Sequence, residues 1–149
     1  MERLSSADFA AQYAAWIAKN KIEITSLSGM DVQREELHPR LREYQKDAVL
    51  WALRIGHGLI AAKFGLGKTT MQIEILRQVH RTVGGTQLVI CPLGVRQQFT
   101  HEDGPEMGVD FRYVRNDAEA QAALDDGHDF LITNLSLIHI SEPTRLRRI

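Results

Sequence analysis

The feature that most constrains the fold is an uninterrupted succession of an apolar run, a glycine-containing loop and an amphipathic helical pattern. The run Gly58–Ala62 has the length and composition of a short buried strand. The stretch Lys68–Thr82 carries apolar residues at helical spacing and is followed by Gly84 and Gly85, which are typical of a helix end. A strand that a short loop joins to a helix is the first half of a βαβ unit, so this region predicts an α/β fold.

The same alternation of elements continues on both sides of this unit. We expect helices over Arg42–Ile55, Val95–Glu102 and Asp117–Leu124, strands over Gln87–Cys91, Phe111–Val114 and Asp129–Thr133, and a Gly/Pro/Asp loop directly after Glu102. Short apolar strands that alternate with amphipathic helices favour a mainly parallel sheet with helices on both faces. The sequence therefore predicts a three-layer α/β sandwich, preceded by a helix that begins near Ser5 and ends near Asn20.

The loop between the first strand and its helix has the composition of a phosphate-binding loop. From Ala62 to Thr69 it reads A-K-F-G-L-G-K-T, which fits the spacing G-x-x-x-x-G-K-[ST] except at the first position. Gly65 and Gly67 permit backbone conformations that bring N–H groups close to phosphate oxygens. Lys68 supplies a positive charge for the β- and γ-phosphates, and the Thr69 hydroxyl can bind Mg²⁺. With the positive end of the following helix, the loop predicts a nucleoside-triphosphate site.

Composition and charge narrow the class of protein. The 149 residues are 44% hydrophobic and 25% charged, which is typical of a soluble globular domain. The 18 Lys and Arg residues against 19 Asp and Glu give a net charge of −1, so no strongly basic character indicates a nucleic-acid partner. No apolar run approaches the roughly 20 residues of a membrane-spanning helix, and no secretory signal is found. The single Cys91 excludes an internal disulfide and a cysteine zinc site, so we expect a cytoplasmic protein.

Three further stretches stand in a fixed order around the loop. Leu41–Ala48, upstream, contains Gln45; Leu88–Leu93 reads as an apolar strand followed by C-P-L; and Phe130–Asn134 reads F-L-I-T-N. Together with the loop, they resemble superfamily-two helicases and translocases of the DEAD/DEAH-like or Swi/Snf-like kind. The loop is similar to motif I of that superfamily and Leu41–Ala48 to its Q motif. Leu88–Leu93, with the Q-F-x-x-E pattern that begins at Gln98, is similar to motif Ia.

The resemblance implies a RecA-like fold, here an incomplete first lobe, and a set of site residues. The catalytic residues would be Lys68 and Thr69, and the nucleotide would be bound by Gln45, Phe64, Gly65, Leu66, Gly67, Lys68, Thr69 and Thr70. The cofactors implied are ATP and Mg²⁺, with the metal held through the Thr69 hydroxyl. Nucleic acid, expected as double-stranded DNA, would be contacted by Pro92, Leu93, Thr133 and Asn134. Lys63 departs from the pattern, because many Swi/Snf-like members carry an acidic pair at the first two loop positions.

The sequence is expected to divide into three parts. Residues 1–40 would form an N-terminal helix and connector, reminiscent of a lead segment in phage and bacterial helicases, and 41–134 a partial ATP-binding domain. Residues 135–149 resemble the translation of a transposase-type sequencing adapter, so we expect them not to be native. No acidic motif II, D-E-x-[HDS], follows an apolar strand. We therefore expect a truncated helicase whose full-length parent hydrolyses ATP to move on DNA, while this fragment binds ATP without turnover.

Two other hypotheses about the function of this chain stay open. The loop could belong to a different phosphate-loop enzyme, such as a small-molecule kinase, although the long segment before it and the C-P-L after the second strand argue against this. Alternatively, the chain could be a non-catalytic nucleotide-binding module. Measurement of ATP turnover separates the helicase from the non-catalytic module.

Overall fold

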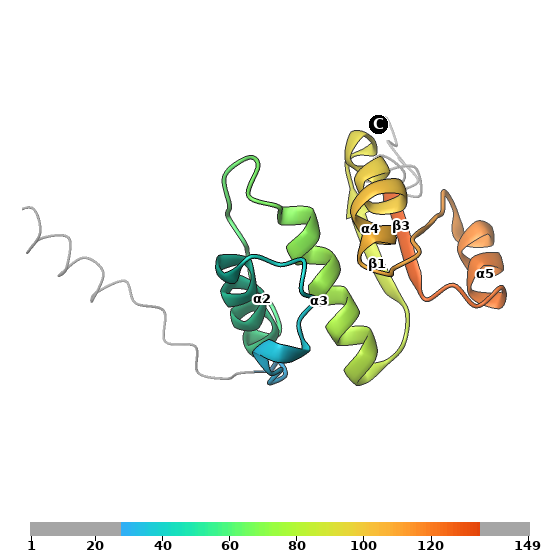
Figure 1. The fold of residues 1–149 in the computed structure, drawn as a ribbon. Helices are drawn as coiled ribbons and strands as arrows, with labels where there is room; N and C mark the ends of the chain where they lie inside the picture. The colour runs from blue at the N-terminus through green and yellow to red at the C-terminus, as the bar shows by residue number, and fades with distance from the viewer. Residues whose placement is uncertain (1–27, 135–149) are drawn as a thin grey trace, which may run out of the picture.

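The computed structural model describes residues 28–134, and these form a three-stranded parallel sheet with helices packed against it (Figure 1). The strands are β1 (Gln87–Cys91), β2 (Arg112–Tyr113) and β3 (Phe130–Asn134), and the α-helices are α2 (Glu43–Ile55), α3 (Lys68–Val83), α4 (Asp103–Glu106) and α5 (Asp117–Asp125). The expected N-terminal helix and the segment 135–149 lie outside the described residues. Within the described range, no helix has the length and apolar character needed to cross a membrane.

The sheet has the order β1-β3-β2, with every pairing parallel, as the alternation of elements predicts. In the β1–β3 register Val89 lies beside Ile132, and Leu88 lies beside Leu131. Because side chains alternate between the two faces of a strand, Val89 and Ile132 share one face while Leu88 and Leu131 share the other.

The two faces of the sheet are covered to different extents. On the first, Val89 and Ile132 are buried in the main core together with Met71 and Phe99. On the second, Leu131 is buried in a smaller cluster with Val114 and with Ala120 and Ala123 of α5, whereas Leu88 and Ile90 of β1 are 52% and 47% exposed. The expected three layers are therefore complete over β3, where α5 packs, and open over β1.

One predicted strand is not formed. The segment Gly58–Ala62 pairs with no strand of the described sheet, and Leu59 is 84% exposed, although Ile60 and Ala62 pack partly against the main core. An apolar run determines which side chains can be buried, but a strand also requires a neighbouring backbone for its N–H and C=O groups. The expectation of a strand here was wrong because the described part of the chain offers no such neighbour to this segment.

The two long helices begin and end where their capping residues predict. Gln45 Oε1 accepts a hydrogen bond from the Arg42 N–H at the start of α2 (2.8 Å), and Gly56 ends that helix with a left-handed φ of 81°. Gly67 precedes α3, which ends before Gly84. Both helices match their predicted spans to within one residue at each end.

The helical region after β1 is longer than expected. It comprises a 3₁₀ turn (Leu93–Val95), a π-type turn (Gln98–Glu102) and α4, so the Gly/Pro/Asp sequence forms a helix instead of the predicted loop. Pro105 is compatible with the first turn of a helix, where its missing N–H has no partner to lose. Gly104 also lies so close to the Phe99 carbonyl that a Cβ there would clash, so this part of the helical region requires glycine.

Candidate nucleotide-binding site

The loop Ala62–Thr69 lies at the carboxyl end of the parallel strands, beside the N-terminus of α3 (Figure 1). Two of its residues require glycine: Gly65 has a φ of 81° and Gly67 a φ of 69°, in the left-handed region that other residues rarely adopt. A Cβ at Gly65 would meet nothing within 4 Å, so the loop is open on that side. The backbone conformation and the open space are those expected of a loop that surrounds an anion.

The Lys68 ammonium group lies over the inner side of this loop. Its Nζ donates to the carbonyl oxygens of Ala62 (3.0 Å) and Lys63 (3.1 Å), and no carboxylate pairs with it in the described residues. Since carbonyl oxygens carry only partial charge, Lys68 retains a full positive charge that phosphate oxygens could compensate better. The structure therefore places the predicted lysine where the predicted anion would be bound.

The first N–H groups of α3 contribute partial positive charge at the same place as the Lys68 ammonium group. Met71 N–H donates to Gly67 C=O (3.1 Å), which makes it the first amide of the helix with a backbone acceptor. The N–H groups of Lys68, Thr69 and Thr70 have none among the described residues. Unpaired amides at a helix N-terminus favour a bound anion, and here they coincide with the loop and the lysine.

Gln45 is buried and stabilises the loop through a hydrogen bond. Its side chain is 5% exposed, and its Nε2 donates to the Leu66 carbonyl (3.1 Å) while its Oε1 is occupied by the Arg42 N–H. The Tyr44 hydroxyl donates to the same Leu66 carbonyl (3.4 Å). A Cβ added at Gly67 would clash with Gln45 Nε2. Gln45, expected from the Q motif to bind the nucleotide, is thus in contact with the phosphate loop itself.

Thr69 is joined to the helical region that follows β1. Its hydroxyl donates to Gln98 Oε1 (3.2 Å), a contact between residues far apart in sequence. Because the proton is directed at Gln98, the lone pairs of the hydroxyl oxygen stay available to a cation. The sequence places Gln98 in the motif Ia pattern but does not predict this contact, which depends on how α3 packs beside the sheet.

The remaining nucleotide-binding predictions fall into exposed and buried positions. Phe64 projects fully into solvent at the tip of the loop, and Leu66 is 38% exposed, while Thr70 is buried on the first turn of α3. The Phe64 side chain is thus accessible to a ligand, whereas the buried Thr70 side chain lies beneath the loop, with its hydroxyl oxygen next to Gly67.

The four predicted nucleic-acid contacts also differ in exposure. Pro92 and Leu93 are exposed immediately after β1, whereas Thr133 is half-buried and Asn134 is buried at the end of β3. All four lie at the carboxyl end of the sheet.

Cys91, beside them, is buried, and this burial raises the pKa of its thiol, which disfavours a nucleophilic role.

The implied ATP and Mg²⁺ require different groups from the residues present. The loop, Lys68 and the free amides fit a polyphosphate, because they combine positive charge with open space. For the metal, the described residues contain no group of three or more His, Cys, Asp or Glu side chains able to hold an ion. The Thr69 hydroxyl fits as one ligand, and Mg²⁺ in such sites takes most of its other ligands from phosphate and water.

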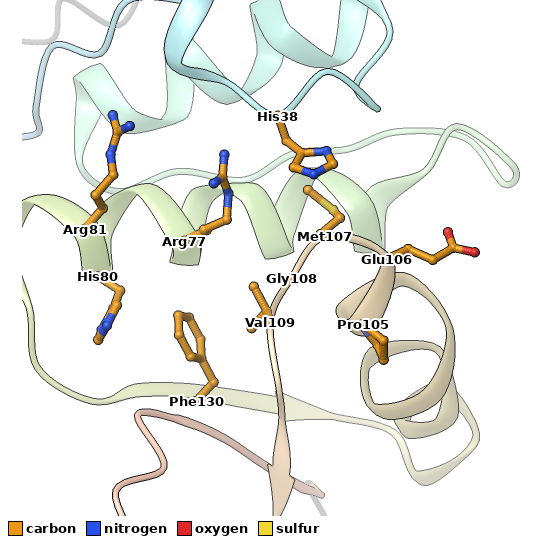
Figure 2. Close-up of a pocket in the computed structure, with 10 residues that line it drawn as sticks. All are labelled: His38, Arg77, His80, Arg81, Pro105, Glu106, Met107, Gly108, Val109 and Phe130. Carbon is orange, nitrogen blue, oxygen red and sulfur yellow. The ribbon is translucent and has the colours of Figure 1, made fainter.

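A separate pocket of about 680 Å³ lies at the opposite, amino end of the sheet (Figure 2). Its lining combines apolar residues with cationic ones: His38, Arg77, His80, Arg81, Pro105, Glu106, Met107, Gly108, Val109 and Phe130. Both arginines are already paired, Arg77 with Glu74 and Arg81 with Glu36. No sequence motif indicates this pocket, and the charges of its two arginines are compensated within the protein.

Comparison with known proteins identifies the fold of this chain but not its family. The chain is similar in structure to the UvsW helicase from bacteriophage T4, with a TM-score of 0.52 and 18% sequence identity over 95% of this chain and 46% of that chain. The chain thus spans about half the length of that helicase. No protein-family model and no curated protein matches the sequence. The fold is accordingly an α/β arrangement consistent with part of a RecA-like helicase lobe, as predicted.

Proposed function

We propose that this chain is the ATP-binding part of an ATP-dependent nucleic-acid helicase or translocase. The observation that carries the proposal is the convergence of Lys68, the positive-φ glycines and the unpaired amides of α3 at one end of a helicase-like fold. A small-molecule kinase would use the same loop. The helicase fold and the ordered motifs on both sides of the loop favour the translocase.

In this proposal Lys68 binds the β- and γ-phosphates and Thr69 binds Mg²⁺ through its hydroxyl. Bound Mg²⁺ neutralises charge on the phosphates during phosphoryl transfer. Gln45 sets the position of the loop through Leu66, and Gln98 orients the Thr69 hydroxyl. Pro92 and Leu93 present exposed surface to a nucleic acid at the same end of the sheet. DNA remains the proposed partner of the full-length parent.

Binding of a fluorescent ATP analogue to the 149-residue chain tests the nucleotide site. Lys68→Ala should weaken binding at least about tenfold, because the lysine is the one fully charged donor on the inner side of the loop. Lys63→Ala is the matched control, since it removes the same charge from an exposed side chain of the same loop. Equal affinities for the two variants would contradict the assignment.

ATP turnover tests the second half of the proposal. We expect the 149-residue chain to bind ATP and to show no DNA-stimulated hydrolysis, because the sequence contains no acidic motif II. Hydrolysis stimulated by DNA and abolished by Lys68→Ala would show that the chain is catalytically sufficient. Phosphate transfer to a small molecule would support the kinase instead.

A further inference from the structure

A second groove lies on the flank of the sheet, beside β2 and α5. Its volume is about 670 Å³, and it is lined by Leu93, Arg96, Arg112, Tyr113, Arg115, Glu119, Ala122, Ala123 and Asp126. Strand β2 is an edge strand that pairs only with β3 in the described sheet. The groove therefore follows an open edge, between the helical region after β1 on one side and α5 on the other. In Figure 1, α5 stands on the opposite side of the sheet from α2, so the groove is separate from the phosphate loop.

Most arginines in the described part of the chain form an ion pair with a carboxylate. These are Arg34, Arg40, Arg54, Arg77, Arg81 and Arg115. Arg96 and Arg112 form no ion pair within residues 28–134, and both line this groove. Arg42, at the start of α2, is the other arginine without one. Two uncompensated guanidinium groups in one groove favour an anionic ligand from outside the described residues.

The acidic residues of the groove do not compensate these charges. Glu119 is engaged by Arg115, whose Nε and Nη2 donate to Glu119 Oε1 (2.9 and 2.6 Å) and whose backbone N–H donates to Oε2 (3.0 Å). This pairing lowers the pKa of Glu119 and raises the pKa of Arg115. Asp126 is the remaining acidic residue in the lining, against Arg96 and Arg112, so the residues that line the groove keep a net positive charge.

Arg96 is held in place by an aromatic ring. Its guanidinium carbon lies 4.4 Å from the centroid of the Tyr113 ring, a cation–π contact that orients the planar group without using its N–H donors. Tyr113 pairs with Ile132 and Arg112 with Leu131, so the two neighbouring side chains project to opposite faces of β2. Arg96 and Arg112 thus stand on the two sides of the open edge, where an elongated anion crossing that edge can contact both.

We propose that this groove binds the phosphodiester backbone of a nucleic-acid strand, with Arg96 and Arg112 as the phosphate contacts. Guanidinium groups suit this role because they match phosphate geometry and stay charged. Leu93, one of the exposed residues at the carboxyl end of the sheet, also lines the groove, so a strand bound there continues along a connected surface. The identity of the anion rests on the proposed translocase function, whereas the binding site rests on the distribution of charges.

The test measures binding of a fluorescein-labelled oligo(dT) to the full 149-residue chain by fluorescence anisotropy. The probe is about 20 nucleotides long, which exceeds the roughly 4–16 nucleotides that common single-strand binders occupy. Titrations between about 50 and 200 mM salt give the salt dependence of the affinity. The double variant Arg96→Gln/Arg112→Gln should bind about tenfold more weakly at low salt. The slope of log K against log salt should fall in magnitude by about 1.4, from about 0.7 for each lost phosphate contact.

The matched control is Arg40→Gln/Arg54→Gln, which removes the same net charge from arginines that have carboxylate partners. It should leave both the affinity and the slope unchanged, and Arg96→Lys/Arg112→Lys should restore most of the slope. Thermal unfolding of each variant, followed by circular dichroism, verifies that the fold is retained. Equal losses in the two Gln variants, or no binding of oligo(dT) by the unaltered chain, would overturn the proposal. Displacement of the probe by poly-L-glutamate at much lower concentrations than by unlabelled oligo(dT) would overturn the nucleic-acid assignment in favour of an acidic protein partner.

Failure of this proposal is distinguishable from failure of the proposed nucleotide site. Binding of the ATP analogue in the same samples should be unchanged in the Arg96/Arg112 variant, because the groove is remote from the loop. Lys68→Ala should leave the oligo(dT) slope unchanged. If the unaltered chain binds oligo(dT) but not the ATP analogue, the nucleotide site is contradicted. If it binds the ATP analogue but not oligo(dT), the groove is contradicted.

Discussion

The two ends of the sheet hold similar basic residues in opposite electrostatic situations. At the amino end, Arg77 and Arg81 line a pocket and are compensated by Glu74 and Glu36 (Figure 2). At the carboxyl end, Lys68 contacts only carbonyl oxygens of its own loop. Paired charges hold the protein together, whereas an uncompensated charge remains available to a ligand. Charge pairing, and not pocket size, therefore distinguishes the end of the sheet at which we propose that the nucleotide binds.

Glu74 is at the centre of the ion pairs and hydrogen bonds at the amino end of the sheet. It is fully buried and accepts hydrogen bonds from Arg77 Nε (2.9 Å), from Gln78 Nε2 (2.6 Å) and from the His38 backbone N–H (3.1 Å). This one carboxylate therefore ties the connector before α2 to the middle of α3. The loop at the other end has no buried carboxylate in this role among the described residues, and the contacts that α2 makes with it are two hydrogen bonds to the Leu66 carbonyl.

The largest expected effect on stability comes from Glu74→Ala. The substitution leaves Arg77 and a backbone N–H without their acceptor in a buried place, which should lower the free energy of unfolding by about 3–5 kcal/mol. Urea unfolding measures the change, and Asp31→Ala, at an exposed ion pair with Arg54, should change little. At a temperature where both variants are folded, binding of the ATP analogue should be unaffected. Weaker ATP binding by folded Glu74→Ala would mean that the two ends are coupled.

A smaller effect is expected at the loop, from Gly67→Ala. Alanine at a φ of 69° is strained, and its Cβ would also clash with Gln45 Nε2, so we expect a loss of about 2 kcal/mol together with weaker ATP binding. Gly65→Ala is the internal comparison, because it shares the positive φ but meets nothing within 4 Å; it should cost about 1 kcal/mol. Identical unfolding curves for the two variants would show that the contact with Gln45 is unimportant.

The smallest expected effect is the pH dependence of stability that His38 causes at the amino end of the sheet. Burial, and then the neighbouring Arg77, lower the pKa of His38 below its ordinary value near 6.5, and its Nδ1 accepts from the Arg40 N–H (3.3 Å). The unfolded chain therefore binds the proton more readily, so stability should fall as pH drops through 6.5 and level off below the folded pKa. His38→Gln should flatten this part of the pH profile in urea unfolding, while the exposed His57→Gln should not. An unchanged slope in His38→Gln would refute the assignment.

Much of the fold followed from local patterns. The spacing of apolar residues and the capping glycines predict α2, α3 and α5 closely, because a helix satisfies its hydrogen bonds within one segment. Two predictions were wrong because the structure there depends on other parts of the chain. These were the strand Gly58–Ala62 and the loop at Asp103–Glu106. A strand needs a partner, and α4 is stabilised by packing against α3, neither of which a local pattern contains.

The candidate site divides in the same way. The sequence alone determined which residues could bind a phosphate, because Gly65, Gly67 and Lys68 act through their own backbone freedom and charge. Only the tertiary structure decided that Gln45 supports the loop, that Gln98 accepts from Thr69, and which arginines have carboxylate partners. Such pairings join residues distant in sequence, and they depend on how helices and strands pack, which no local spacing of residue types specifies.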